Sequence, residues 1–226
     1  MTLTLLFKVA ASFLLCGMLK SSDVFTSGKP FTIVGLGDST TAGTPGFMSP
    51  RESPPIGKGD VQSQYAYWIQ KERPDWKVFN EGVRGQRTDQ IKKRMESAVY
   101  SHRPDVVVVL AGINDLHQGY SEEEAQKNLE GIYNNLSDRG IPFIICTTLP
   151  YNLMTPEVET RLLKLNTWIA SYAIQNKIPL CDTYKILSVQ GRLINSPDDI
   201  HPDVAGYRKI GEALIPLLEK FAILSK

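Results

Sequence analysis

The chain has 226 residues, a formal net charge of +1 and a charged fraction of 22%, which suit one domain with a sizeable apolar core. It has no block of basic residues and no basic helix face, so we do not expect nucleic acid as a partner. Its three cysteines, Cys16, Cys146 and Cys181, are too few for a disulfide scaffold and lack the spacing of metal ligands.

The first 28 residues differ in character from the rest of the chain. Residues 9–19 are almost wholly apolar and lie between Lys8 and Lys20, and this run is too short to span a bilayer comfortably. We expect a secretory signal peptide or N-terminal apolar segment over residues 1–28, a domain over residues 29–226, and hence a secreted or periplasmic protein. The alternative is an extra helix docked on the domain of a cytoplasmic protein.

An apolar run that begins at Phe31 breaks into Gly37-Asp38-Ser39, which predicts a first strand that delivers a serine into a turn. A buried strand that ends in glycine and a hydroxyl residue can present a nucleophile at the edge of a sheet, although these residues also form ordinary turns. The next residues, 41–64, are rich in proline and glycine and predict a long loop. We expect this loop to be a flap on the substrate side or a mere insertion.

Strand and helix patterns then alternate to the end of the chain. This alternation predicts an α/β protein, a doubly wound three-layer α/β/α sandwich with a central five-stranded parallel sheet. Cys146 and Cys181 fall in the fourth and fifth strands, where we expect buried free thiols; a disulfide would require the two strands to be neighbours. The further strands are predicted at 77–80, 105–111, 142–148 and 178–182. A first helix is predicted at 61–73, a second after a cap at Thr88, and a third from a Ser121/Glu124 capping box to Gly140. Two more helices are predicted, one that begins at Thr155-Pro156 and one after Asp203.

Polar residues follow several of these strands. In an open parallel sheet, ligands bind beyond the carboxyl ends of the strands, near the point where the strand order reverses. That rule brings Ser39, the turn with Gly85, and Asn114 to one edge of the sheet. His201 approaches from the segment that precedes the last helix.

A serine nucleophile needs a base, and the chain has only three histidines. His102 lies at a helix end and is expected to be solvated, and His117, expected on the loop after the third strand, is a weaker candidate. His201 has Asp198 three residues ahead, which offers a carboxylate to orient the imidazole. Asp199 stands next to that carboxylate, and a backbone carbonyl can also orient a histidine, so both alternatives stay open.

These residues supply the parts of an acyl-transfer site. Ser39 would attack, His201 would accept the proton, and Asp198 would fix the tautomer and stabilise the imidazolium. The tetrahedral intermediate needs hydrogen-bond donors for its oxyanion. The backbone N–H groups of Ser39 and Gly85 and the side-chain amide of Asn114 are available at the same edge.

With these residues the chain resembles the GDSL esterase/lipase family of the SGNH hydrolase superfamily over residues 31 to about 220. Four motif blocks match in the order of the family, namely Gly37-Asp38-Ser39, residues 80–85, Gly112-Ile113-Asn114-Asp115 and Asp198-Asp199-Ile200-His201-Pro202. The resemblance implies a flavodoxin-like SGNH fold, a Ser-His-Asp carboxylic ester hydrolase without metal or other cofactor, and Ser39, Gly85 and Asn114 as oxyanion donors. Thr40, where the family often has leucine or isoleucine, and the 41–64 loop are departures that bear on the substrate.

Several functions remain open at this point. Short acyl or acetyl esters, of small molecules or carbohydrates, are the expected substrates, with lysophospholipids or thioesters of longer acyl chains as alternatives. A non-catalytic carbohydrate-binding relative or a nucleotide-binding domain are alternatives of another class; the latter would use Gly35-Leu36-Gly37, but Thr40 replaces the third glycine and Asp38 would repel a pyrophosphate. The chain lacks the Gly-x-Ser-x-Gly elbow of α/β-hydrolases. We expect no stable membrane insertion of the mature domain.

Overall fold

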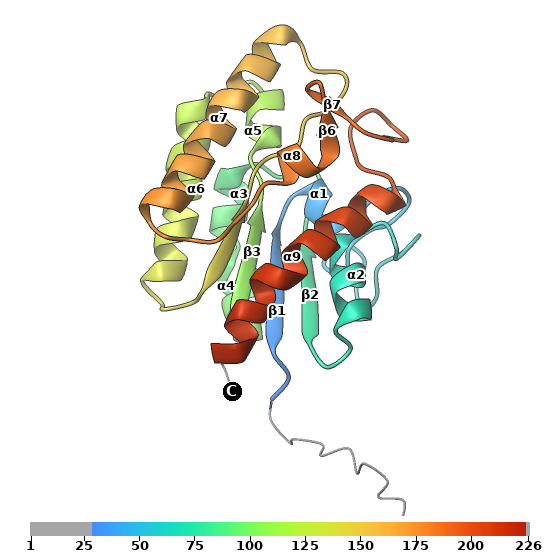
Figure 1. The fold of residues 1–226 in the computed structure, drawn as a ribbon, viewed down its shortest axis with the longest axis vertical. Helices are drawn as coiled ribbons and strands as arrows, with labels where there is room; N and C mark the ends of the chain where they lie inside the picture. Colours follow the sequence, from blue (N-terminus) through green and yellow to red (C-terminus); the bar gives the residue numbers. More distant parts are fainter. Residues whose placement is uncertain (1–28, 225–226) are drawn as a thin grey trace, which may run out of the picture.

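The computed structural model describes residues 29–224, so the expected signal peptide lies outside the described residues. Five parallel strands form one sheet in the order β2-β1-β3-β4-β5 (Figure 1). This is the predicted α/β class, with the flavodoxin-like strand order. The strands are β1 (Thr32–Gly37), β2 (Lys77–Gly82), β3 (Val106–Leu110), β4 (Phe143–Cys146) and β5 (Leu180–Cys181), and a separate antiparallel hairpin consists of β6 (Ser188–Val189) and β7 (Arg192–Leu193).

The two central strands explain why the sheet is parallel and covered on both faces. Every residue of β1 and of β3 is buried, and both strands are nearly continuous apolar runs. Such runs fit a sheet with helices on both sides, because successive side chains point to opposite faces. In the register of β1 with β3, Ile33 is paired with Val106 and Gly37 with Leu110, so the two strands end side by side.

Helices cover both faces of the sheet. One apolar cluster joins Val34 and Leu36 of the sheet to α3, α4, α6 and α7, and the other joins Ile33 and Val108 to α2 and α9. In Figure 1, α9 runs in front of the sheet with α2 beside it. The helices are α1 (Ser39–Ala42), α2 (Tyr65–Glu72), α3 (Thr88–Lys93), α4 (Met95–Ala98), α5 (Ile113–His117), α6 (Glu122–Ser137), α7 (Pro156–Gln175), α8 (Thr183–Leu187) and α9 (Val204–Leu224), with a 3-10 turn at Tyr100–His102.

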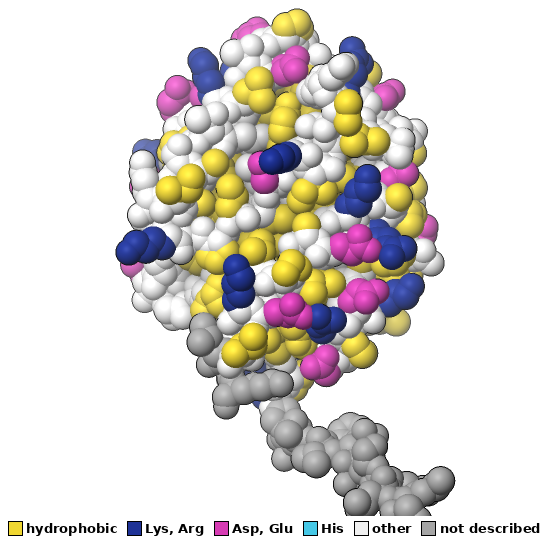
Figure 2. Space-filling model, viewed as in Figure 1, with side chains coloured by type: hydrophobic (Ala, Val, Ile, Leu, Met, Phe, Trp, Pro, Cys, Tyr) yellow, Lys and Arg dark blue, Asp and Glu magenta, His cyan; other side chains and the backbone are white. Residues whose placement is uncertain are grey.

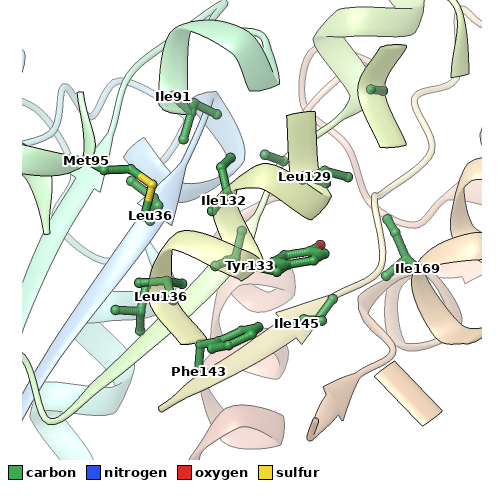
Figure 3. Close-up of a cluster of buried hydrophobic side chains, with 14 of the residues drawn as sticks. Leu36, Ile91, Met95, Leu129, Ile132, Tyr133, Leu136, Phe143, Ile145 and Ile169 are labelled. Carbon is green, nitrogen blue, oxygen red and sulfur yellow. The ribbon is translucent and has the colours of Figure 1, made fainter. Parts of the chain in front are cut away.

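The core between α6 and the sheet holds large side chains in fixed contact (Figure 3). The ring of Tyr133 stacks on that of Phe143 with 5.6 Å between centroids, and Ile132 and Leu136 of the same helix are fully buried. Burial of each such side chain contributes roughly 1.5–3 kcal/mol. These contacts anchor α6 to β4 and hold the sheet edge above them in place.

The observed helix caps and short elements can be compared with the predicted ones. Ser121 and Thr155 cap α6 and α7 as predicted. The predicted cap at Thr88 is wrong: Thr88 is the first residue of α3, and its hydroxyl instead donates a hydrogen bond to Asp115 at 2.5 Å. The sequence did not predict α5, α8 or the β6-β7 hairpin, because segments of two to five residues are too short to show a period.

The surface charges and the two buried cysteines match what the composition predicts. Figure 2 shows acidic and basic side chains interspersed with apolar ones on the face that α9 covers. Cys146 and Cys181 are register partners in neighbouring strands, and both are buried free thiols, as expected. Within residues 29–224, no helix combines the length and hydropathy that crossing a membrane requires.

Candidate active site

A cavity of about 310 Å³ opens at the carboxyl edge of the sheet. It lies where β1 and β3 end, which is where the strand order reverses and where open α/β sheets bind ligands. The cavity is lined by Ser39, Thr40, Arg84, Gly85, Ile113, Asn114, His117, Gln118, Leu149, Pro150, Tyr151, Ile200 and His201. Four of the five site residues expected from the sequence are therefore on its wall.

The turn after β1 brings Ser39 to this cavity. Strand β1 ends at Gly37, where a Cβ atom would lie 2.2 Å from the carbonyl oxygen of Leu110, so only glycine fits. Asp38 then caps α1, because its side chain accepts a hydrogen bond from the backbone N–H of Thr40 at 2.9 Å. Ser39 is thus the first residue of a short helix, 8% exposed and facing the cavity.

His201 joins this serine to a carboxylate. Its Nε2 lies 2.9 Å from Oγ of Ser39, and its Nδ1 lies 2.8 Å from Oδ2 of Asp198. The other oxygen, Oδ1, accepts hydrogen bonds from the backbone N–H groups of Ile200 at 3.0 Å and His201 at 2.8 Å. Partial burial acts to raise the pKa of Asp198, but the hydrogen bonds from His201 and the two backbone groups outweigh it and hold this pKa below its usual value.

The neighbouring carboxylate serves another contact. Asp199 accepts a hydrogen bond from the side-chain amide of Asn152 at 3.2 Å, and its carbonyl accepts one from the Asn152 backbone N–H at 2.6 Å. Ser196 donates from its hydroxyl to the carbonyl of His201 at 2.7 Å. The structure therefore brings Asp198 to the imidazole and directs Asp199 to the segment after β4.

Two further donors face the same cavity. Gly85 lies in a turn with φ of +71°, which favours glycine, and among residues 29–224 its N–H makes no hydrogen bond. Asn114 donates one side-chain amide hydrogen to the carbonyl of Gln86 at 3.0 Å, and the second hydrogen of that amide remains for a ligand. Gln118 donates to the carbonyl of Gly85 at 2.8 Å and so fixes the turn.

The 41–64 loop supports this turn from behind and does not cover the cavity. None of the residues 43–64 lines the cavity, so the expectation of a flap on the substrate side is wrong for this conformation. Glu52 of the loop accepts hydrogen bonds from the backbone N–H of Arg84 at 3.1 Å and from its guanidinium at 2.9 Å. Ser49 donates to the carbonyl of Gly82 at 2.6 Å. The loop thereby holds Arg84 at the rim.

The opposite wall is largely apolar and carries a histidine–tyrosine pair. Ile113, Leu149 and Ile200 line it together with Tyr151. His117, which lies on α5 and not on a loop as predicted, places Nδ1 3.1 Å from the Tyr151 hydroxyl, with the two rings edge to face. His117 therefore belongs to the wall and is engaged with tyrosine, away from the Ser39 hydroxyl that His201 contacts.

The third histidine differs from its expectation. His102 was expected to be solvated, but its side chain is 20% exposed and its Nε2 lies 2.8 Å from Oε1 of Glu81. Its ring stacks on Phe79 with 3.9 Å between centroids. The prediction failed because the carboxylate and the ring come from β2, which is distant in the sequence.

Asp38, directly before the serine, is fully buried and predicts a pH-dependent stability. Burial, and to a lesser degree the charge of Asp115, raise its pKa to about 7. Between pH 4 and 7 this carboxyl binds more protons in the native state than in the unfolded state, so its contribution to the free energy of unfolding falls as pH rises, by up to about 1.4 kcal/mol per pH unit. Asp38→Asn, which keeps the acceptor for Thr40, should flatten this slope in urea denaturation curves.

A fixed packing cost of the asparagine would shift the whole curve and leave its slope unchanged. The difference between the two proteins should therefore change between pH 4 and 7 and become constant above pH 7. Parallel curves for the two proteins across that range would contradict the buried carboxyl as the cause.

Sequence reasoning missed several residues of this site. Tyr151 and Gln118 reach the cavity, and Gln86 accepts from Asn114, but none of the three stands in a recognisable motif. Position gave a signal for two of them, since Gln86 lies four residues after the end of β2 and Tyr151 five residues after the end of β4, whereas Gln118 lies eight residues after the end of β3. Among residues 29–224, no group of three or more His, Cys, Asp or Glu side chains is arranged to hold a metal ion.

Comparison with known proteins identifies a family and a shared fold. The model of the GDSL-like Lipase/Acylhydrolase family matches residues 36–209. Over 86 residues the chain is 37% identical to the N-acylneuraminate cytidylyltransferase of Streptococcus agalactiae, which covers 38% of the chain and 21% of that protein. The chain therefore matches about a fifth of the length of this relative.

Solved structures share the fold. A GDSL-like lipase from Bacteroides thetaiotaomicron superposes with a TM-score of 0.68 at 21% identity, over 84% of this chain and 88% of the other. A carbohydrate acetylesterase family member from Sinorhizobium meliloti superposes with a TM-score of 0.65 at 19% identity, over 84% and 98%. At these identities the likeness shows the three-layer fold.

Proposed function

The chain belongs to the GDSL-like lipase/acylhydrolase family. On this premise we propose that it is a carboxylic ester hydrolase in which Ser39 is the nucleophile, His201 the general base and Asp198 the carboxylate that orients the base. The observation that carries the proposal is the continuous hydrogen-bond chain between these side chains, 2.9 Å and 2.8 Å long, at the wall of the cavity. A nucleophile within hydrogen-bond reach of a base that is itself oriented by a third group is the arrangement that activates a serine.

The proposed reaction proceeds through an acyl-enzyme. The Ser39 Oγ attacks the ester carbonyl carbon while Nε2 of His201 takes its proton, and Asp198 stabilises the imidazolium. The oxyanion of the tetrahedral intermediate accepts hydrogen bonds from the backbone N–H groups of Ser39 and Gly85 and from the amide of Asn114. Collapse expels the alcohol, which receives the proton from His201, and water then releases the acid by the same steps.

For the substrate we propose a short acyl ester, such as an acetyl ester, of a small polar alcohol or a carbohydrate. The cavity of about 310 Å³ is at the small end of ligand sites, and the His117–Tyr151 pair limits its apolar side. Arg84 and Gln118 on the rim offer polar groups to the alcohol part. The Sinorhizobium protein of similar fold is named as a carbohydrate acetylesterase, which agrees with this proposal.

The sequence at the N-terminus supports a proposal about location. The apolar run over residues 9–19, with a lysine on either side, has the length of a secretory signal, and residues 29–226 would then be the mature domain. We propose that this domain is secreted or periplasmic.

A series of p-nitrophenyl esters tests the proposed substrate. We expect kcat/KM to be highest for the acetate and butyrate and to fall by about tenfold or more at the octanoate, because each methylene outside a fitted pocket forfeits about 0.8 kcal/mol of burial. Acetylated xylan or an acetylated monosaccharide should also be deacetylated. A maximum at the laurate would instead favour a lysophospholipase or thioesterase.

A wall variant makes the same test sharper. Tyr151→Ala should move the optimum toward longer acyl chains, because the Tyr151 side chain closes the apolar side of the cavity. Leu153→Ala is the matched control, since Leu153 is 64% exposed and is not a lining residue. An unchanged chain-length profile of Tyr151→Ala would place the acyl group elsewhere.

A further inference from the structure

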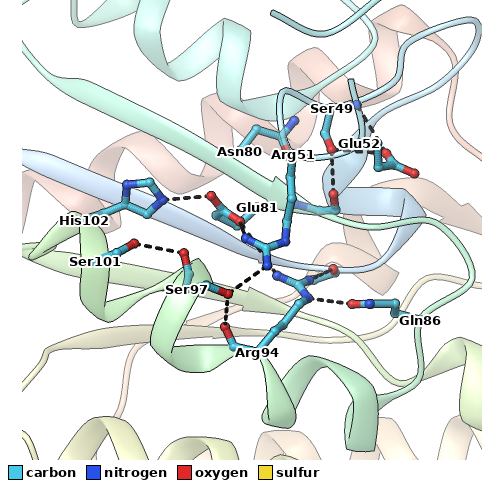
Figure 4. Close-up of polar contacts among 12 residues, drawn as sticks. Ser49, Arg51, Glu52, Asn80, Glu81, Gln86, Arg94, Ser97, Ser101 and His102 are labelled. Atoms are coloured by element: carbon cyan, nitrogen blue, oxygen red, sulfur yellow. Dashed lines mark hydrogen bonds and ion pairs between the residues drawn. The ribbon is translucent and has the colours of Figure 1, made fainter. Parts of the chain in front are cut away.

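A buried arginine lies behind the two turns that form the floor of the cavity. Arg94, which follows α3, has a side chain only 9% exposed. Its Nη2 donates to the carbonyl of Gly37 at 2.8 Å, and its Nε donates to Oε1 of Gln86 at 2.6 Å (Figure 4). One planar guanidinium therefore bridges the end of β1 and the turn after β2.

Each of these contacts is close to a proposed oxyanion donor. Gly37 is two residues before Ser39, and Gln86 directly follows Gly85. The carbonyl of Gln86 accepts the hydrogen bond from the Asn114 side chain at 3.0 Å. The guanidinium is thus linked to the Ser39 N–H through Gly37, and to the Gly85 N–H and the Asn114 amide through Gln86.

The end of β1 is itself held from two directions. The carbonyl of Gly37 accepts a hydrogen bond from the backbone N–H of Val83 at 3.2 Å as well as the one from Arg94. The backbone bond ties the nucleophile strand to the beginning of the Gly85 turn, and the guanidinium ties it to the end of that turn at Gln86. Without the guanidinium, the Val83 bond is the one of these two ties that still joins Gly37 to the turn.

A purely electrostatic role beside Glu81 does not account for this geometry. Glu81 already has Arg51 at 2.6 Å and His102 at 2.8 Å, while Nη1 of Arg94 is 3.9 Å away. Nη1 has no hydrogen-bond partner among the described residues, whereas Nε and Nη2 are both bonded. In Figure 4 the side chains of Arg51 and Arg94 approach from opposite sides.

The charge of Arg94 persists at the pH at which esterases are assayed. Burial, and then the positive charge of Arg51, lower its pKa to about 10, so the guanidinium remains protonated at neutral pH. Its two donated hydrogen bonds are therefore charge-assisted, which makes them stronger than neutral ones.

We propose that Arg94 is a positioning residue that sets the spacing between the Ser39 N–H, the Gly85 N–H and the Asn114 amide, so that the three converge on one oxyanion. This inference rests on the proposed function. Its physical basis is that an oxyanion hole acts only if its donors are fixed before the charge develops, and one misplaced donor costs about 10²- to 10³-fold in kcat.

Two lysine substitutions provide a matched test. Arg94→Lys keeps the charge, but a single ammonium cannot hold both Gly37 and Gln86 in the planar geometry of a guanidinium. Arg51→Lys makes the same chemical change on the other side of Glu81, where Arg51 contacts neither of these residues. We expect Arg94→Lys to lower kcat by about tenfold or more with KM changed less than about threefold, and Arg51→Lys to keep kcat.

Arg94→Met should lower kcat by about 10²-fold, with Arg94→Lys intermediate. Combined with Asn114→Ala, the Arg94→Met loss should be smaller than in the wild-type background, because the two changes affect the same donor. Equal kcat values for Arg94→Lys, Arg94→Met and wild type would overturn the inference. A rise in KM with kcat unchanged in the Arg94 variants would overturn the inference as well.

A second readout does not depend on activity. In ¹H–¹⁵N NMR spectra, the Gly85 backbone and Asn114 side-chain amide signals should shift in Arg94→Lys and stay in place in Arg51→Lys. If wild type hydrolysed no ester but these signals shifted, the positioning role would stand and the proposed function would fail. If wild type hydrolysed esters and the signals did not move, the positioning role would fail and the proposed function would stand.

Discussion

Ser39→Ala is expected to abolish hydrolysis of short p-nitrophenyl esters, with kcat lowered by about 10⁴-fold or more. The physical reason is that the hydroxyl is the only nucleophilic atom within hydrogen-bond distance of His201 Nε2, at 2.9 Å, among the described residues. An alanine leaves the cavity and the proposed oxyanion donors in place, so we expect a small residual rate. Stopped-flow or steady-state release of p-nitrophenol measures the loss.

We expect the Ser39→Ala variant to keep the wild-type fold, which serves as the control for this prediction. Within residues 29–224 the Ser39 side chain forms a hydrogen bond with His201 alone, and the capping bond between Asp38 and Thr40 does not involve the Ser39 hydroxyl. The thermal midpoint should therefore shift little, and circular dichroism should be unchanged. Activity retained in Ser39→Ala would show that another residue is the nucleophile.

Asp198→Asn is expected to lower kcat by about 10³- to 10⁴-fold, because an amide at this position no longer stabilises the imidazolium and can favour the wrong tautomer of His201. The pKa of Asp198 lies below its usual value, so the carboxylate is ionised throughout the neutral range. Its contribution to stability is present above the pKa of the unfolded chain and is lost as pH falls through the lower native pKa. Titration of this carboxyl should therefore not cause the fall of wild-type kcat on the acidic side of its pH profile.

Asp199→Asn is the matched control for this prediction. The residue next to Asp198 has φ of +62°, which asparagine tolerates, and its side-chain oxygen accepts from Asn152, a role that an amide oxygen retains. We expect kcat within about threefold of wild type. A larger loss in Asp199→Asn than in Asp198→Asn would exchange the roles of the two carboxyl groups.

Strong local patterns predicted the elements that position the site. The apolar residues over 105–111 predicted the third strand, and the Thr155-Pro156 pair predicted the beginning of α7, because both signals depend on a few adjacent residues. Helix α5 was not predicted, since five residues are too few to show helical periodicity. Its helical form is decided by packing against α6 and α7.

The sequence by itself determined the α/β class, the five strands of the sheet with the longer helices between them, and the candidate set Ser39, Gly85, Asn114, Asp198 and His201. Short motifs encode these five residues, three of them after strand ends and two in the segment before α9. Only the tertiary structure decided which groups surround them. It brought Asp198 and not Asp199 to the imidazole, removed the 41–64 loop from the cavity wall, and placed a guanidinium behind both turns.

The physical reason is the range of the interactions. Capping, glycine turns and apolar periods act over a few residues and leave a local signal, whereas the bond from Arg94 to Gly37 joins residues 57 positions apart and that from His201 to Ser39 joins residues 162 apart. Such contacts form only when the sheet brings its carboxyl ends to one edge, and a family motif can identify the second contact while nothing in the sequence marks the first.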